Sequence, residues 1–145
     1  MYEKPRRGLV VVADVMTRDV KTLRRNDPLA LADEIMKRER IRHLPVLDED
    51  GLVAGIVSDR DLFHRTLVAA LGYGAAQQQN LLSMLRVKEV MANEVLTIAP
   101  DTPLPVAART MVERKVGCLP VVDGERLVGI LTEGDFVAFA ALDED

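Results

Sequence analysis

Two short stretches of the chain place a hydroxyl group and a carboxylate three residues apart, directly after an apolar run. They are Ser58-Asp-Arg-Asp61 and Thr132-Glu-Gly-Asp135. This spacing is typical of a helix start, in which the hydroxyl caps the helix and the carboxylate accepts a backbone N–H. The same groups suit ligand chemistry, because a helix N-terminus favours a phosphate and a carboxylate accepts both hydroxyls of a ribose. For either stretch alone, a helix cap without a ligand is the simpler interpretation.

A phosphate and a carboxylate repel each other, so the two kinds of group must address different parts of one ligand. A nucleotide meets this requirement, since its ribose offers hydroxyl donors and its phosphates offer negative charge. The turns therefore indicate a nucleotide site as the functional alternative to simple helix caps.

The two turns belong to an internal duplication. A shift of 75 residues lays Val15 on Val90 and Leu44-Pro-Val46 on Leu119-Pro-Val121. With one extra residue in the first copy, the glycine before the first turn also meets the glycine before the second. Similarity at a fixed period is the mark of a repeated structural unit.

Each copy predicts the same order of elements: strand, helix, strand, strand, helix. The first helix follows Asp27-Pro28 or Thr102-Pro103, which suits an N-cap followed by proline at the first helical position. The predicted strands cover 20–23, 43–47 and 52–57 in the first copy and 95–98, 118–122 and 127–131 in the second. Apolar residues at helical spacing are expected to be buried: Leu29, Ala32, Ile35, Met36, Leu104, Ala107 and Met111. The fold class is therefore α/β, with two β-α-β-β-α repeats that share a core.

These motifs resemble the paired CBS domain, named for cystathionine beta-synthase, in the arrangement called a Bateman module. The resemblance rests on the ordered set VMT, RHLPV and GIVSDRD, matched in the second copy by EVM, GCLPV and GILTEGD. It divides the chain into repeats at 9–64 and 86–140 joined by a helical connector at 65–85. It implies two pseudo-symmetric repeats packed sheet to sheet, with an adenosine-containing ligand in the cleft between them.

The resemblance also implies roles for individual residues. Asp61 and Asp135 would bind ribose, and Ser58 and Thr132 would lie toward phosphate. Thr22 and Thr97 match residues that approach the base or ribose, although both also fit ordinary strand positions.

Basic residues distinguish the first copy from the second. Arg42 and His43 lie before Leu-Pro, where basic residues of related modules reach ligand phosphates, and Arg60 lies within the turn. The second copy has Gly117, Cys118 and Gly134 in these places. The first copy is therefore expected to carry the anion chemistry. Solvated surface charge is the alternative for both arginines, and a packed, hydrogen-bonded side chain is the alternative for the histidine.

Composition narrows the class of protein. The net charge of -4 removes the basic excess that nucleic-acid binding normally uses, although several arginines in the first half leave that alternative open. Cys118 is the only cysteine, and it is expected to be a core thiol in a cytoplasmic protein. Common catalytic and metal motifs such as G-x-S-x-G, H-E-x-x-H and C-x-x-C are missing, so we expect no enzyme and no bound metal.

The uncharged connector, 66–85, has the length of a membrane span, but its central amides make spanning unfavourable. Its leucines predict either core cover or a homodimer contact. Taken together, the sequence predicts a cytoplasmic sensor of an AMP, ADP or ATP-class ligand that signals to an unidentified effector protein. The alternatives are an unliganded dimerisation scaffold, a sensor of S-adenosylmethionine or NAD, and a nucleic-acid-associated protein.

Overall fold

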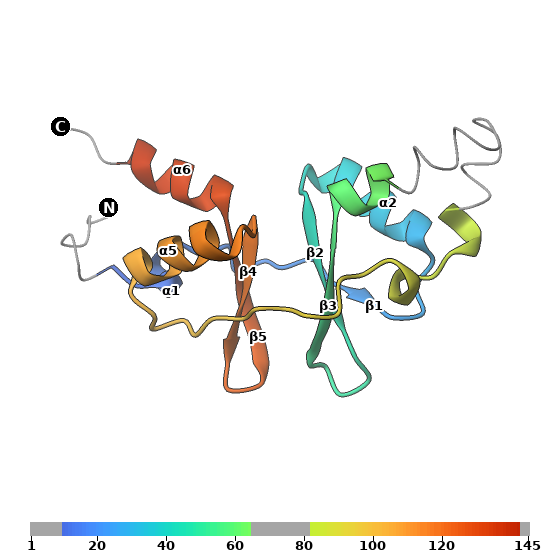
Figure 1. Cartoon of the computed structure of the whole chain (residues 1–145), viewed down its shortest axis with the longest axis horizontal. Helices are drawn as coiled ribbons and strands as arrows, with labels where there is room; N and C mark the ends of the chain where they lie inside the picture. The colour runs from blue at the N-terminus through green and yellow to red at the C-terminus, as the bar shows by residue number, and fades with distance from the viewer. Residues whose placement is uncertain (1–9, 65–81, 143–145) are drawn as a thin grey trace. The chain divides into compact units, whose positions relative to one another are not determined.

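The computed structural model describes residues 10–64 and 82–142, and these form two compact units (Figure 1). Unit 1 contains residues 10–20 and 96–142, and unit 2 contains 21–64 and 82–95. Each unit combines a small sheet with helices, so the predicted α/β class is confirmed. Unit 1 combines two separate stretches of the chain, whereas unit 2 lies within the single range 21–95.

Unit 2 is built on a three-stranded sheet in the order β1-β2-β3. Strand β1 (Leu23–Arg24) is parallel to β2 (His43–Leu47), and β2 is antiparallel to β3 (Val53–Ser58). Helix α2 (Leu29–Glu39) connects the first two strands. The tight β2–β3 turn contains Gly51 at φ 82°, a left-handed conformation that favours glycine.

Unit 1 repeats this plan. Helix α5 (Leu104–Arg114) precedes the antiparallel pair β4 (Cys118–Asp123) and β5 (Arg126–Thr132), and helix α6 (Glu133–Ala141) follows. The strand predicted at 95–98 is reduced to a single parallel bridge between Ile98 and Val121. The predicted first strand of the other copy is likewise shorter than expected and shifted, at β1.

The start of each first helix differs by one residue from the prediction. The N-caps are Pro28 and Pro103, and not the preceding Asp27 and Thr102. The Asp27 carboxylate instead accepts the N–H of Arg24 at 2.7 Å, inside the turn that leads to the helix. Pro28 and Pro103 themselves have extended backbone, with ψ of 143° and 135°, and they form bridges with Arg86 and Val11, so each helix begins only after the proline.

Each unit buries the apolar residues that the helical spacing predicts. Leu29, Ala32, Ile35 and Met36 lie in the core of unit 2, and Leu104, Ala107 and Met111 lie in the core of unit 1. Strand residues complete both cores, among them the fully buried Leu44, Val46, Val57, Leu119, Val121 and Leu131.

A short lead-in segment closes each core, and it comes from the opposite repeat. The lead-in with α1 (Val12–Val15) belongs to unit 1, and the lead-in with the 3-10 helix η1 (Val87–Glu89) belongs to unit 2. The Val12 N–H donates to the Thr102 carbonyl, and the Val87 N–H donates to the Asp27 carbonyl, both at 2.9 Å. The two lead-ins therefore dock in the same way.

The lead-ins also pair with the last strand of each unit. Thr17 and Ile130 exchange two backbone hydrogen bonds of 2.9 Å, and Ala92 and Ile56 exchange two of 2.9 and 3.1 Å. Thr17 and Ala92 therefore occupy equivalent places, one in each unit.

The predicted connector lies mostly outside the described residues. Of its described part, Leu82 is buried and Leu85 packs against the core of unit 2, which supports core cover for these two leucines. None of the helices in the described residues has the length and apolar character needed to cross a bilayer.

Candidate functional site

The first candidate turn joins β3 to the helical residues 59–64. The backbone N–H and the hydroxyl of Ser58 both donate to Oδ2 of Asp61 at 2.9 Å, and the Asp61 N–H donates back to the Ser58 hydroxyl at 3.2 Å. This reciprocal pattern is the helix-start geometry that the spacing predicts. Within residues 10–64 and 82–142, Oδ1 of Asp61 has no hydrogen-bond partner.

The second turn joins β5 to α6 and has the same internal bonds. The N–H and hydroxyl of Thr132 reach Oδ2 of Asp135 at 2.9 and 3.2 Å, and the Asp135 N–H donates to the hydroxyl at 3.3 Å. Here the second oxygen is also engaged, because the hydroxyl of Thr17 donates to Oδ1 of Asp135 at 2.8 Å.

Thr17 is a residue that the sequence prediction did not select. The only signal for it lies in the alignment of the copies, where Thr17 after Val-Met falls on Ala92. That difference acquires meaning only when the lead-in is seen to dock on the other repeat.

The strand register brings the basic residues of the first copy to the first turn. His43 on β2 is the cross-strand partner of Ser58 on β3, and the Asp59 N–H donates to the carbonyl of Arg42 at 2.9 Å. The side chains of Arg42 and Arg60 are exposed, and that of His43 is half-buried. Four of the predicted residues, with Asp61, therefore gather at one end of the sheet of unit 2.

The corresponding place in unit 1 has no cationic side chain from these positions. Cys118 is the partner of Thr132, and the Glu133 N–H donates to the carbonyl of Gly117 at 3.2 Å. Burial raises the pKa of the Cys118 thiol to about 12, which keeps it protonated and unreactive. The prediction that this cysteine is an inert core thiol is thus supported.

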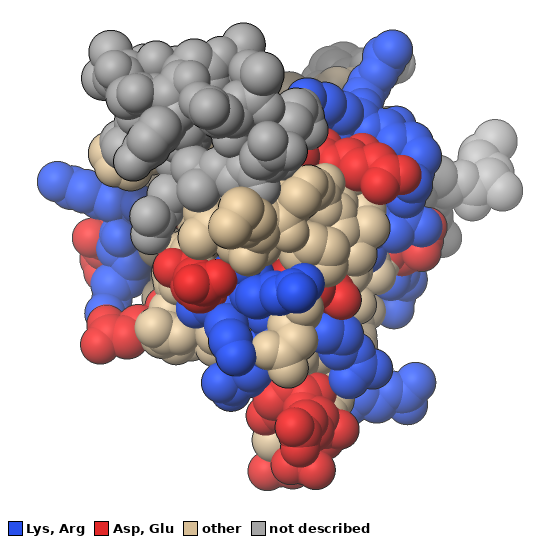
Figure 2. Space-filling model, turned by 90° about the vertical axis from the view of Figure 1, so that its right-hand side faces the viewer, with Lys and Arg blue, Asp and Glu red and all other residues tan. Residues whose placement is uncertain are grey.

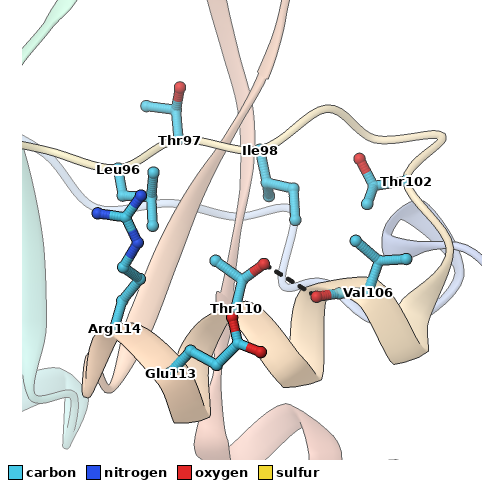
Figure 3. A pocket seen from close by; sticks show the side chains of 8 residues that line it. All are labelled: Leu96, Thr97, Ile98, Thr102, Val106, Thr110, Glu113 and Arg114. Atoms are coloured by element: carbon cyan, nitrogen blue, oxygen red, sulfur yellow. Dashed lines mark hydrogen bonds between the residues drawn. The ribbon is translucent and has the colours of Figure 1, made fainter.

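Thr97 precedes Ile98, which forms a parallel bridge with Val121 of β4. Thr97 borders a groove of about 350 Å³ between residues 96–98 and helix α5 (Figure 3). In this view Leu96 and Ile98 point toward α5, whereas Thr97 points away from it. Neither Thr132 nor Asp135 lines the groove, so the groove is separate from the turn. Thr22, which precedes β1, is half-buried.

The exposed charges of helix α2 are largely paired with one another. Lys37 donates to Asp33 at 3.0 Å, and Arg38 contacts Glu34 and Glu39 at 3.4 and 3.2 Å. Figure 2 shows basic and acidic side chains interspersed over one face of the protein. This pattern does not form the continuous basic stripe that a nucleic-acid backbone requires.

Metal-ligand side chains do not cluster in the described part of the chain. No group of three or more histidine, cysteine, aspartate or glutamate residues is placed there to hold an ion. The geometry around both turns is that of hydrogen-bonded carboxylates beside hydroxyl groups.

Comparison with known proteins agrees with this architecture. The chain is 34% identical over 125 residues to a homoserine O-acetyltransferase of Methanococcoides burtonii, but it spans only 23% of that protein. It is 33% identical to the CBS domain-containing protein YhcV of Bacillus subtilis, with 86% of this chain and 81% of YhcV covered. The match with the acetyltransferase is therefore a match with one region of a longer protein.

Two solved structures of similar fold contain adenosine compounds. The CBS domain pair of protein MJ0100, solved with 5′-methylthioadenosine and S-adenosyl-L-methionine, is 28% identical with a TM-score of 0.75, covering 94% of this chain and 99% of that one. CBSX2, solved in complex with AMP, is 31% identical with a TM-score of 0.72, covering 91% and 96%. The CBS domain family model matches residues 12–67 and 87–141. The duplicated turns, the paired Leu-Pro-Val strands and these matches together show that the chain belongs to the CBS domain family and carries two CBS domains.

Proposed function

We propose that this protein is a regulatory module without catalytic activity that binds an adenosine-containing ligand of the AMP, ADP and ATP class. The observation that carries the proposal is the Ser58–Asp61 turn. Ser58 holds one carboxylate oxygen in place, and the other oxygen has no partner in the described part of the chain. A fixed carboxylate with an oxygen to spare is suited to accept the hydroxyls of a ribose.

Charge favours a ligand with phosphates over S-adenosylmethionine. Arg42 and Arg60 belong to this turn and to the adjoining strand end, and both are exposed. Arginine binds phosphate oxygens in a planar, bidentate manner, whereas it repels the positive sulfonium of S-adenosylmethionine. Among the similar structures, CBSX2 was solved with AMP and the MJ0100 domain pair with S-adenosyl-L-methionine, so both ligands are candidates that the charge of this turn distinguishes.

Calorimetric titration with AMP tests the proposal. We expect Asp61→Ala to weaken AMP binding by about 10- to 150-fold, because a charged hydrogen-bond acceptor contributes about 1.5–3 kcal/mol. Asp59→Ala is the matched control, since it removes the same charge from an exposed neighbour. That variant should bind AMP within about threefold of wild type, as expected for an exposed charge.

The fold of each variant is checked by circular dichroism, because Asp61 also caps a helix. Wild-type protein that gives no heat with AMP, ATP or S-adenosylmethionine at millimolar concentration would support an unliganded scaffold. Folded Asp61→Ala that binds AMP as well as wild type would reduce Asp61 to a helix cap.

We also propose that the module is a cytoplasmic homodimer that signals to an effector protein. The lone, protonated Cys118 fits a reducing compartment. Large apolar side chains are exposed on two helices of unit 1, with Val112 at 77% and Val137 at 71%. Burial of such exposed apolar side chains against a second copy of the chain would remove them from water.

A further inference from the structure

Thr17 and Ala92 form a natural matched pair inside the molecule. Each is paired through two backbone hydrogen bonds with an isoleucine of the last strand, Ile130 or Ile56. Each follows a buried methionine. The backbone surroundings are thus the same, and the side chains differ by a hydroxyl and a methyl group.

That hydroxyl changes the state of the aspartate beside it. The Thr17 hydroxyl reaches Oδ1 of Asp135 at 2.8 Å, although the two residues are 118 positions apart. Ala92 has no hydroxyl to offer to Asp61. The difference therefore lies in one added donor at one of two otherwise matched carboxylates.

A count of acceptor positions turns this difference into a binding property. A carboxylate has about four lone-pair positions on its two oxygens. Asp135 receives two donors from Thr132 and one from Thr17, which leaves one position. Asp61 receives two donors from Ser58, which leaves two positions in the described part of the chain. A vicinal diol donates two hydrogen bonds, so it needs two free acceptor positions, and of these two carboxylates only Asp61 offers both.

We propose that Thr17 is a selectivity residue that weakens the Asp135 turn as a site for the ribose diol, so that the first nucleotide bound by each chain lies at Asp61. Ala92 is the counterpart that keeps the Asp61 turn open. This inference rests on the proposed function, since it assigns the ribose to one of the two turns. The absence of basic side chains at positions 117, 118 and 134 works in the same direction.

Titration with AMP and with its 2′,3′-dideoxy analogue tests this assignment. Wild type should bind a first AMP more tightly than any second one, and should lose most of the affinity of the first event with the dideoxy analogue. Thr17→Val keeps the branched shape that suits the strand pairing and replaces the hydroxyl with a methyl group, which donates no hydrogen bond. We expect it to strengthen a second, diol-dependent event by about 2- to 12-fold, which is the value of one released hydrogen bond.

Two further variants complete the design. Thr17→Ser retains the hydroxyl and should titrate as wild type does. Ala92→Thr introduces a hydroxyl beside Asp61 and should weaken the first event by about 2- to 12-fold. Asp61→Ala combined with Thr17→Val isolates the second event, because it removes the first binding carboxylate.

The outcomes separate this inference from the proposed function. Wild type that binds AMP, with Thr17→Val giving the same isotherm, overturns the role of Thr17 and leaves the proposed function standing. Two equal diol-dependent events per wild-type chain would also overturn it. No binding of AMP to any variant overturns the proposed function, and the assignment of the ribose falls with it.

Discussion

The sulfur atom of Met16 occupies the space in which a side chain at Gly129 would begin. A Cβ atom built on Gly129 would lie 2.5 Å from that sulfur, and one built on Gly55 would lie 2.6 Å from the sulfur of Met91. Real Cβ atoms essentially never come so close to another heavy atom, and the backbone oxygens of Thr17 and Ala92 would lie only 3.0 and 2.8 Å away, so a side chain at either glycine would force the lead-in to shift. The same contact is present in both units, at Gly129 in one and at Gly55 in the other.

Gly129→Ala and Gly55→Ala should therefore destabilise the protein. We expect a loss of about 1–3 kcal/mol in the free energy of unfolding for each, because the added methyl overpacks a filled core. Urea denaturation followed by circular dichroism measures this loss.

Gly134→Ala is the control for these glycines. Its nearest neighbour outside the helix backbone would be the Thr132 hydroxyl at 3.6 Å, an ordinary contact. Because alanine is a better helix former, we expect this variant to gain about 0.5–1 kcal/mol. Equal losses at Gly129 and Gly134 would show that the Met16 contact does not set the requirement for glycine.

Two helices end at a residue whose backbone conformation is strained and would be relaxed in glycine. Arg40 after α2 and Lys115 after α5 have φ values of 55° and 56°. Left-handed backbone costs a non-glycine residue about 1–2 kcal/mol. Arg40→Gly and Lys115→Gly should each raise the melting temperature, with a gain of about 0.5–1 kcal/mol.

A glycine inside the same kind of helix provides the comparison. Arg109→Gly, at an exposed position within α5, should cost about 1 kcal/mol. If all three glycine variants lose stability by the same amount, backbone strain at the helix ends contributes nothing measurable.

Cys118 should make stability depend on pH in the alkaline range. Burial raises the pKa of its thiol from 9.0 to about 12, so the unfolded chain loses this proton first. The contribution of the protonated thiol to the free energy of unfolding is complete below pH 9. It declines by about 1.4 kcal/mol per pH unit as the pH rises from 9 toward 12. Wild type and Cys118→Ala are compared by urea denaturation between pH 8 and 10.5.

The difference between the two proteins is the quantity to follow, because other groups titrate in both. We expect it to be constant below pH 9 and to shift in favour of Cys118→Ala above it. A difference that stays flat up to pH 10.5 would mean that the folded thiol ionises as readily as an unfolded one.

Arg60 and Arg42 should recognise phosphate and not adenosine. We expect Arg60→Ala and Arg42→Ala to weaken AMP binding by about 10-fold or more, since each removes a charged hydrogen bond to phosphate. Adenosine binding should change little. Arg25→Ala provides a charge-matched control on the same unit, and calorimetry with both ligands makes the measurement.

The proposed homodimer should persist in moderate salt, because apolar burial is screened far less than ion pairing. Sedimentation of wild type at tens of micromolar should give twice the chain mass. Val112→Lys places a charge on the exposed apolar side of α5 and should shift the protein toward monomer. A wild-type monomer under these conditions would contradict the proposal.

Much of the local structure could be predicted from the sequence, because strong signals agreed with one another. His43–Leu47 is a strand with the predicted bounds, since a β-rich run there ends at turn residues. The Thr132 cap follows from its hydroxyl and the carboxylate at Asp135. The sequence placed the cap of α2 one residue too early, at Asp27 and not at Pro28. The Asp27 side chain in fact accepts a hydrogen bond within the preceding turn and not from the helix.

The docking of the lead-ins could not be predicted in the same way. Both copies have the same methionine and the same glycine, so spacing alone does not say which glycine Met16 covers. The choice is made by tertiary packing between segments more than 100 residues apart. The Thr17–Asp135 hydrogen bond depends on that docking. This is why Thr17 could not be identified as a site residue from the sequence.

The exchange of lead-ins also decides what a broken chain would do. The path runs from unit 1 into unit 2 at residues 20–21 and returns at 95–96. A single cleavage between residues 64 and 82 would give two fragments, each of which supplies the lead-in of one unit and the body of the other. Neither fragment alone would contain a complete core, because each core needs the lead-in of one fragment and the body of the other. The protein is thus connected as if two identical subunits had traded their first segments and had later been joined end to end.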